Sequence, residues 1–193
     1  MRKIRIMEHV SLEGVIAPPG AMPLLNHLAA DRLIQKKFGL SRSPDWPKVE
    51  KTFLAAHPRC VVCGQTKPLN VHHKFPFHYV VLCGRPDLEL DPRNLITLCV
   101  PPNYEHHLLL GHLDDYESYN PRVLTAVKTY ASQTAVKIRK AVKWQQARTA
   151  KPRHLDQMTP AEKIAFKKML DRKFPLKPAL FVKAVQARTA LQN

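Results

Sequence analysis

Apolar side chains recur at helical spacing in two segments of the N-terminal part of the chain. Between Pro23 and Phe38 they predict a helix that ends before Gly39. A second helix is expected after a cap at Ser43 or Asp45, because the residues that follow form one apolar face. That face consists of Trp46, Val49, Phe53 and Leu54.

Two short runs rich in apolar residues predict a β-hairpin. Leu69 to Lys74 forms the first strand, and Asn94 to Cys99 forms the second. The connection from Phe75 to Pro92 is longer than an ordinary hairpin turn, and long loops in compact domains usually have a function. Tyr104 to Leu110 is then expected to be a helix that crosses the hairpin.

Helical signals dominate the C-terminal part. Val123 to Ala147 contains neither Gly nor Pro, which predicts one long helix after Pro121. A capping signature at Thr159 opens another helix that runs to about Leu170. Pro178 opens a last helix, through Ala190.

These patterns divide the chain into four parts. They are an N-terminal strand or arm (residues 1–22), a helical lead-in (23–57), a domain rich in Cys and His (58–120) and a basic helical extension (121–193).

The net charge of +16 is concentrated in the extension. Residues 1–120 contain 14 Lys and Arg against 12 Asp and Glu, whereas residues 121–193 contain 17 against 3. Such a segment favours binding to a phosphate backbone, with an affinity that falls steeply as salt rises. A solvated tail, or one that binds RNA or an acidic protein, is the other interpretation.

The spacing of the cysteines predicts a structural zinc site. Cys60 and Cys63 form a C-x-x-C pair that can bind one tetrahedral Zn²⁺ from a tight turn, and Gly64 supplies the necessary flexibility. Cys99 and His106 would complete a closed Cys3His shell. Two alternatives stay open: the C-x-x-C pair is a redox pair, or Cys83 replaces His106 as the fourth ligand.

A structural zinc accepts four ligands, so other polar groups remain for a second purpose. They are His72, His73, Asn94, His107 and His112. Adjacent residues on a strand point to opposite faces, so His72 and His73 do not easily hold the same ion. If one is a ligand, the other is available for proton transfer.

These residues carry a family resemblance. His72-His73, then Asn-Leu-Ile-Thr-Leu-Cys from Asn94, then His106-His107-Leu-Leu-Leu-Gly-His112 resembles an HNH endonuclease. The resemblance covers a little over a third of the chain. It implies an α+β fold with a small ββα-metal core at residues 58–120, which holds the structural zinc and is flanked by the N-terminal and C-terminal α-helices.

The resemblance also implies residue roles. His73 would be the general base, His72 and His107 would be ligands of a catalytic divalent ion, Mg²⁺ or Mn²⁺, and Asn94 would hold the loop or reach the metal. The chain departs from the family at His106, where relatives commonly have Cys. His112 is a possible third ligand, but in an α-helix it would lie about 140° from His107. It reaches the ion only if Gly111 interrupts the helix.

The sequence thus predicts a metal-dependent endonuclease that hydrolyses DNA. The alternative is a catalytically inactive, zinc-containing protein that binds DNA or another partner. No apolar stretch approaches the ~20 residues needed to span a bilayer, and no signal-peptide core is visible. Cysteines that are better interpreted as zinc ligands than as disulfides indicate a reducing, cytoplasmic setting.

Overall fold

The chain forms two compact units, residues 1–39 and residues 40–193, and a computed structural model describes residues 31–190. In the first unit, residues 31–38 are helical. The helix ends at Gly39, which has a φ of 66° and donates its N–H to the carbonyl of Gln35 at 2.8 Å. This end was predicted. The expected strand or arm in residues 1–22 and the start of the helix lie outside the described residues.

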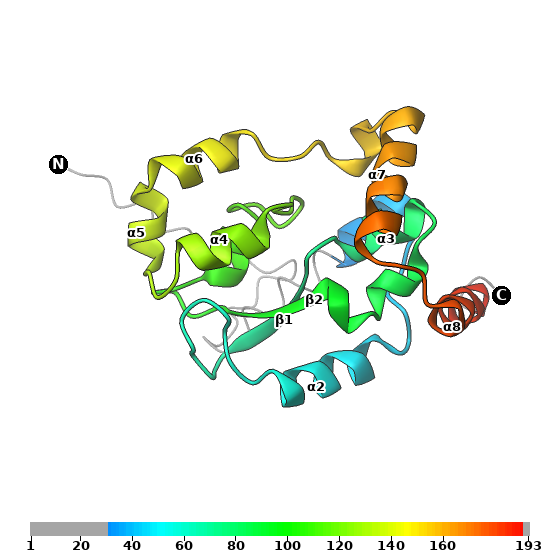
Figure 1. Cartoon of the computed structure of the whole chain (residues 1–193), viewed down its shortest axis with the longest axis horizontal. Helices are drawn as coiled ribbons and strands as arrows, with labels where there is room; N and C mark the ends of the chain where they lie inside the picture. The colour runs from blue at the N-terminus through cyan, green and yellow to red at the C-terminus, as the bar shows by residue number, and fades with distance from the viewer. Residues whose placement is uncertain (1–30, 191–193) are drawn as a thin grey trace, which may run out of the picture. The chain divides into compact units, whose positions relative to one another are not determined.

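The second unit is α+β, with one antiparallel sheet of two strands in the described part (Figure 1). The register runs from Leu69 opposite Cys99 to His73 opposite Leu95. Its elements up to the hairpin's end are α2 (Trp46–Ala56), β1 (Leu69–His73), α3 (Phe77–Leu82), η1 (Pro86–Glu89), η2 (Pro92–Asn94) and β2 (Leu95–Cys99). The predicted helix at Trp46 and the predicted hairpin are confirmed.

Each face of the hairpin is covered by a different hydrophobic core. Leu95 and its neighbours pack against Trp46 and Phe53 of α2. Ile96 packs in a second core with Leu109, Ile138 and Trp144 from the C-terminal half. Directly opposed residues of two antiparallel strands share a face. His72, opposite Ile96, therefore belongs to the face of the second core, whereas His73, opposite Leu95, belongs to the face of α2.

The connection between the strands is folded rather than loose. The segment predicted as a long loop contains α3, η1 and η2, and it buries Arg85 with Asp87 at 2.7 Å. Asn94 is fully buried at its end. Its side-chain amide donates to the carbonyls of Phe75 and Leu88, both at 2.9 Å, and its oxygen accepts the Phe75 N–H at 3.0 Å.

The prediction of one long helix from Val123 to Ala147 was wrong. This stretch forms three helices, α4 (Val123–Thr129), α5 (Ala135–Lys140) and α6 (Val142–Thr149). The first break occurs because Ser132 adopts a φ of 59° and donates its N–H to the carbonyl of Val62 at 2.8 Å. The second occurs at Ala141, whose backbone is extended. Tertiary contacts thus override helix propensity here.

The last two helices, α7 (Pro160–Lys173) and α8 (Pro178–Thr189), begin where the sequence predicts. Thr159 and Glu162 form the expected capping box. Both helices lie on the side of α3 in Figure 1, away from α5 and α6. Ion pairs join them to the strand connection, from Asp171 to Arg85 at 2.9 Å and from Arg188 to Glu89. None of the helices in the described residues is both long and apolar enough to cross a membrane.

Candidate metal centres

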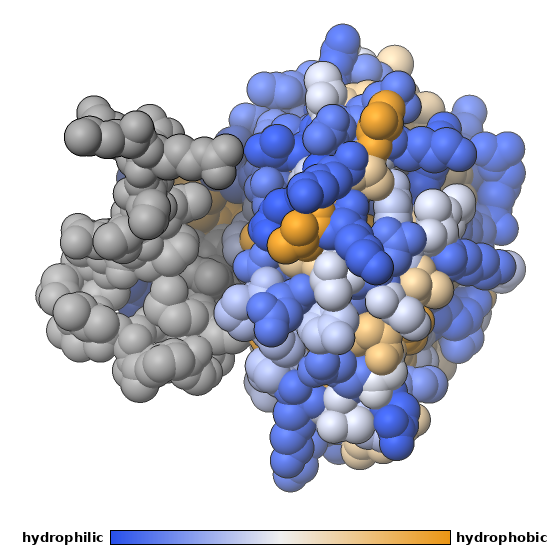
Figure 2. Space-filling view, turned by 90° about the vertical axis from the view of Figure 1, so that its left-hand side faces the viewer, coloured by the Kyte–Doolittle hydropathy of each residue, from blue (hydrophilic) through white to orange (hydrophobic). Residues whose placement is uncertain are grey.

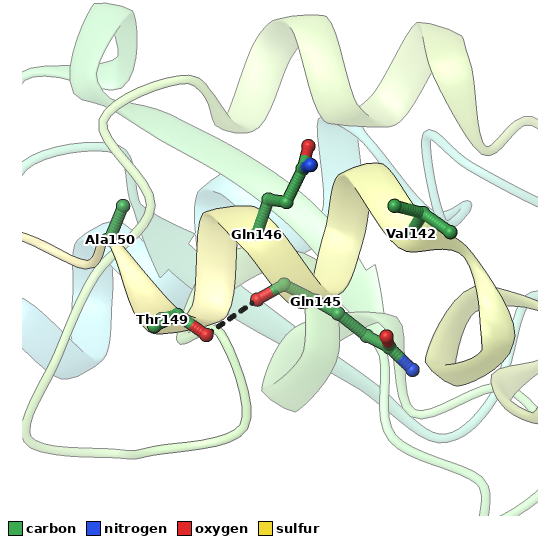
Figure 3. Close-up of a pocket in the computed structure, with 5 residues that line it drawn as sticks. All are labelled: Val142, Gln145, Gln146, Thr149 and Ala150. Carbon is green, nitrogen blue, oxygen red and sulfur yellow. Dashed lines mark hydrogen bonds between the residues drawn. The ribbon is translucent and has the colours of Figure 1, made fainter.

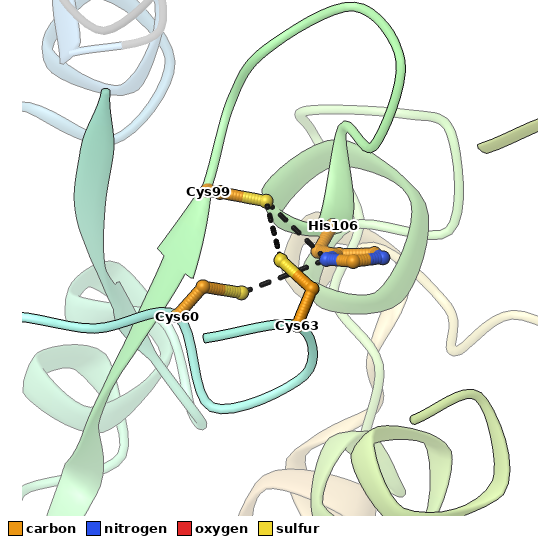
Figure 4. Close-up of side chains that lie close together, drawn as sticks. All are labelled: Cys60, Cys63, Cys99 and His106. Atoms are coloured by element: carbon orange, nitrogen blue, oxygen red, sulfur yellow. Dashed lines mark hydrogen bonds between the residues drawn. The ribbon is translucent and has the colours of Figure 1, made fainter. Parts of the chain in front are cut away.

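The structure brings together the four predicted zinc ligands, Cys60, Cys63, Cys99 and His106, whose ligand atoms all lie within 4.8 Å of one another. Figure 4 shows the three thiols and the imidazole converging on a common point. Cys60 and Cys63 come from the turn before β1, and Cys99 ends β2. His106 lies in the segment that follows, and we call residues 105–114 of this segment the coil.

The distances fit a tetrahedral zinc ion. Around such an ion, two sulfur ligands lie about 3.8 Å apart, and a sulfur and a nitrogen lie about 3.6 Å apart. The Sγ atoms of Cys63 and Cys99 are 3.7 Å apart, and Nδ1 of His106 lies 3.5 Å from Sγ of Cys60 and 3.3 Å from Sγ of Cys99. None of these cysteines forms a disulfide. The residues therefore fit a structural zinc.

The backbone forms a knuckle that holds the first two ligands. The N–H of Gly64 donates to the carbonyl of Cys60 at 2.8 Å, and the N–H of Cys60 donates to the carbonyl of Gln65 at 2.8 Å. Gly64 has a φ of 75°, a conformation that costs glycine nothing. Val61 ties the knuckle to the second strand through a 3.1 Å bond to the carbonyl of Thr97.

Hydrogen bonds prepare the site for a cation. A hydrogen bond from Cys99 is the largest effect that lowers the pKa of the Cys60 thiol, to about 3. The resulting thiolate raises the pKa of Cys99. Nε2 of His106 lies 2.8 Å from the carbonyl of Gln133, so it carries the proton and leaves Nδ1 as the ligand atom.

Cys83 is not part of this cluster. Its side chain is buried near the end of α3, where burial raises the pKa of its thiol. The fourth member of this cluster is His106, and Cys83 does not replace it.

A second cluster consists of His72, His107 and His112, whose ligand nitrogens also lie within 4.8 Å of one another. The ring of His72 lies 5.3 Å from that of His107 and 4.8 Å from that of His112, between centroids. The centroids of His107 and His112 are 4.8 Å apart. We call these three residues the trihistidine cluster.

A π-helical turn explains how His112 reaches the cluster. The predicted helix from Tyr104 to Leu110 is instead a π-helix, η3 (His107–Gly111), with His112 at its C-cap. Because a π-helix joins residue i to residue i+5, it brings residues five apart onto one side, which an α-helix does not. His107 and His112 are five residues apart, so the wider turn brings His112 to the same side as His107. The interruption at Gly111 that the sequence predicted as necessary is not needed.

Two further contacts orient the cluster. Gly111 makes room for His72, because a Cβ atom at this position would lie 2.7 Å from Cε1 of the His72 ring. Nδ1 of His112 lies 2.8 Å from the carbonyl of Ser118, which leaves Nε2 for an ion. No sequence pattern pointed to Ser118, but a glycine next to a candidate ligand was a signal for Gly111.

The donor set indicates which ion the trihistidine cluster fits. It offers three imidazole nitrogens, which suit transition-metal ions such as Zn²⁺, Ni²⁺ and Co²⁺. Mg²⁺ and Mn²⁺ favour oxygen ligands, and neither cluster found among the described residues contains a carboxylate. The expected Mg²⁺ or Mn²⁺ therefore fits less well than a transition-metal ion.

His73 does not join the trihistidine cluster. Its ring lies on Trp46 of α2, with centroids 4.4 Å apart, and its Nε2 lies 2.9 Å from the carbonyl of Glu89. These contacts are on the face of β1 opposite to His72. The role of general base stays a prediction, and the position of this ring does not support it.

One surface hollow of about 400 Å³ lies along α6 (Figure 3). It is lined by Val142, Gln145, Gln146, Thr149 and Ala150, and Thr149 donates its hydroxyl to the carbonyl of Gln145 at 3.0 Å. None of its lining residues is a metal ligand or a titratable group, so it is not the candidate for chemistry.

Comparison with protein-family models, curated proteins and solved structures finds no match for this chain. The function is therefore argued from the two metal centres themselves.

Proposed function

We propose that the protein is a metal-dependent endonuclease that hydrolyses phosphodiester bonds of DNA at the trihistidine cluster. The observation that carries the proposal is the convergence of His72, His107 and His112 beside a separate Cys3His cluster. A closed four-ligand site stabilises a fold, whereas three protein ligands leave positions open for a substrate. Two centres of different kinds on one small hairpin favour an enzyme stabilised by zinc.

The order of these residues along the chain further supports an HNH-type ββα-metal core. His72 lies on the first strand, Asn94 ends the connection, and His107 and His112 lie on the coil after the second strand. Asn94 bonds the start of the connection at Phe75 and its middle at Leu88, and the family resemblance leads us to expect that it holds this loop. The fold and family thus remain part of the proposal.

The chain's own residues would bind and orient the ion. His112 presents Nε2 because Ser118 holds its other nitrogen, and Gly111 lets the His72 ring approach the coil. When bound there, a divalent ion supplies Lewis-acid chemistry that stabilises the extra negative charge of a phosphate under attack.

The basic helices would hold the nucleic acid. Lys137 and Lys140 on α5 and Lys143 on α6 are exposed, and within the described ranges no ion pair involves them. Figure 2 shows a mostly hydrophilic surface on the side of the molecule where α5 and α6 lie, with only small apolar patches. Trp144 of α6 joins this surface to the coil by donating Nε1–H to the carbonyl of Leu109 at 2.9 Å.

The position of His73 favours a second candidate function. A frame that holds two metals and DNA, but has no imidazole base beside the trihistidine cluster, is a zinc-containing binding protein without turnover. In either case the reduced thiols of the zinc site fit the cytoplasmic setting that the sequence predicts.

Plasmid cleavage distinguishes the two functions. Zinc-loaded protein is incubated with supercoiled DNA and Ni²⁺, Co²⁺, Mn²⁺ or Mg²⁺ in separate reactions, and His107→Ala is compared with Arg172→Gln. If the protein is an endonuclease, wild type and Arg172→Gln should produce nicked or linear DNA. His107→Ala should leave the plasmid supercoiled. DNA binding without cleavage under every metal and salt condition supports the binding protein instead.

A further inference from the structure

The coil that carries the metal ligands is strained at both ends. Glu105, one residue before the zinc ligand His106, has a φ of 44°, and Asp114, two residues after His112, has a φ of 66°. Residues other than glycine rarely adopt this left-handed backbone conformation, and it persists only where the surroundings enforce it.

One guanidinium contacts both of these strained residues. NH2 of Arg139, on α5, lies 2.7 Å from Oε2 of Glu105 and 3.5 Å from Oδ1 of Asp114. Arg148 of α6 contacts the other oxygen of Asp114 at 3.4 Å. The two ends of the coil, nine residues apart in sequence, are thus joined through a single cation.

The same segment of the chain also contacts the coil between its ends. The carbonyl of Gln133, just before α5, accepts from His106, and the indole of Trp144 donates to the carbonyl of Leu109. Residues 133–148 therefore contact the coil at both ends and in the middle. Part of the basic extension therefore packs against the segment that carries the candidate metal ligands, instead of lying free in solvent.

We propose that Arg139 is a positioning residue of the trihistidine cluster, because it fixes the coil in the shape that brings His107 and His112 to a common ion. Isolated surface ion pairs contribute little to stability. Here one cation bridges two acids that flank residues 106–113, so its effect falls on ligand geometry more than on global stability. The inference rests on the proposed binding of an ion at the trihistidine cluster, but not on cleavage.

Cobalt binding tests the inference. Full-length protein with one Zn²⁺ per chain is titrated with Co²⁺, whose visible absorption reports the second centre because Zn²⁺ is a d¹⁰ ion without such bands. His107→Ala identifies the signal of the trihistidine cluster. The variants are Arg139→Gln, Arg139→Lys and, as a matched control, the exposed Arg172→Gln on α7.

We expect Arg139→Gln to weaken cobalt binding about tenfold, at the low end of what outer contacts of metal ligands contribute. Zinc content and the melting temperature should change little, Arg139→Lys should restore part of the affinity, and Arg172→Gln should match wild type. Cobalt binding by Arg139→Gln that equals wild type overturns the inference. So does a wild-type protein without a signal that depends on His107.

If Arg139→Gln does not fold, a double variant tests the same inference. Glu105→Gln and Asp114→Asn together remove the same contacts while Arg139 stays. Wild-type cobalt affinity in this double variant also overturns the inference. Failure of the endonuclease proposal gives a different result. The variants would then rank in cobalt affinity as expected, while the DNA stays uncleaved.

Discussion

The His72 ring lies against the backbone of Gly111, so closely that a Cβ atom on residue 111 would meet the ring's Cε1 at 2.7 Å and its Nδ1 at 2.9 Å. Real Cβ atoms do not approach other atoms that closely. The strand and the coil thus meet at a place where only glycine fits, and this contact determines how near His72 comes to His107 and His112.

Gly111→Ala should therefore disturb the trihistidine cluster selectively. The added methyl group pushes the His72 ring away from the coil, so we expect the affinity for Co²⁺ or Ni²⁺ to fall at least about tenfold. Isothermal titration of the zinc-loaded protein measures this affinity. Leu108→Ala, on the same coil, is the control and should retain it. Equal affinities for Gly111→Ala and wild type would show that the contact is not needed.

Cys63→Ala should destabilise the protein by removing a zinc ligand. Binding energy at a structural zinc site is folding energy, so we expect the melting temperature to fall by about 10 °C or more, together with loss of the bound zinc. Cys83→Ala removes a thiol outside the cluster and should keep one zinc per chain. Loss of zinc from the Cys83→Ala protein would indicate that Cys83 is a zinc ligand after all.

His73→Gln should separate packing from catalysis. The ring of His73 is buried on Trp46 and its Nε2 bonds a backbone carbonyl, so we expect a loss of about 1–3 kcal/mol in the free energy of unfolding and unchanged binding of the second ion. DNA cleavage should persist in this variant and vanish in His72→Gln. Loss of cleavage in His73→Gln with both metals bound would instead establish His73 as the general base.

Replacing Lys137, Lys140 and Lys143 together by Gln should weaken DNA binding without unfolding the protein. Each lysine that contacts a phosphate releases about one counterion, so the slope of log K against log salt should fall by up to about 3. The matched control replaces Lys163, Lys168 and Arg172 of α7, which removes the same charge. Equal effects of the two triple variants would mean that charge alone, not the α5–α6 surface, determines binding.

The sequence predicted the convergence of the Cys3His cluster and the hairpin because both follow local rules. A C-x-x-C turn with a following glycine and a strand that ends in Cys99 have spacings that zinc sites share, and all four ligands converge. Short runs rich in apolar residues likewise predicted both strands to within one residue. The capping box at Thr159 was readable for the same reason.

Other features depend on contacts that sequence patterns do not carry. The π-turn after His106 arises where the coil meets Arg139 and the His72 ring, so its helical period was misjudged. The break at Ser132 depends on a bond to Val62, some 70 residues earlier in the chain. The separation of His72 from His73 was expected from strand geometry, but only packing shows which of them lies on Trp46.

Anomalous diffraction from crystals of the zinc-loaded protein soaked in Ni²⁺ tests the two-centre account most directly, since the absorption edges of the two elements distinguish the ions. We predict a zinc peak within about 2.3 Å of the ligand atoms of Cys60, Cys63, Cys99 and His106, and a nickel peak within about 2.1 Å of one nitrogen from each of His72, His107 and His112. A map with no nickel among the three imidazoles would contradict the account.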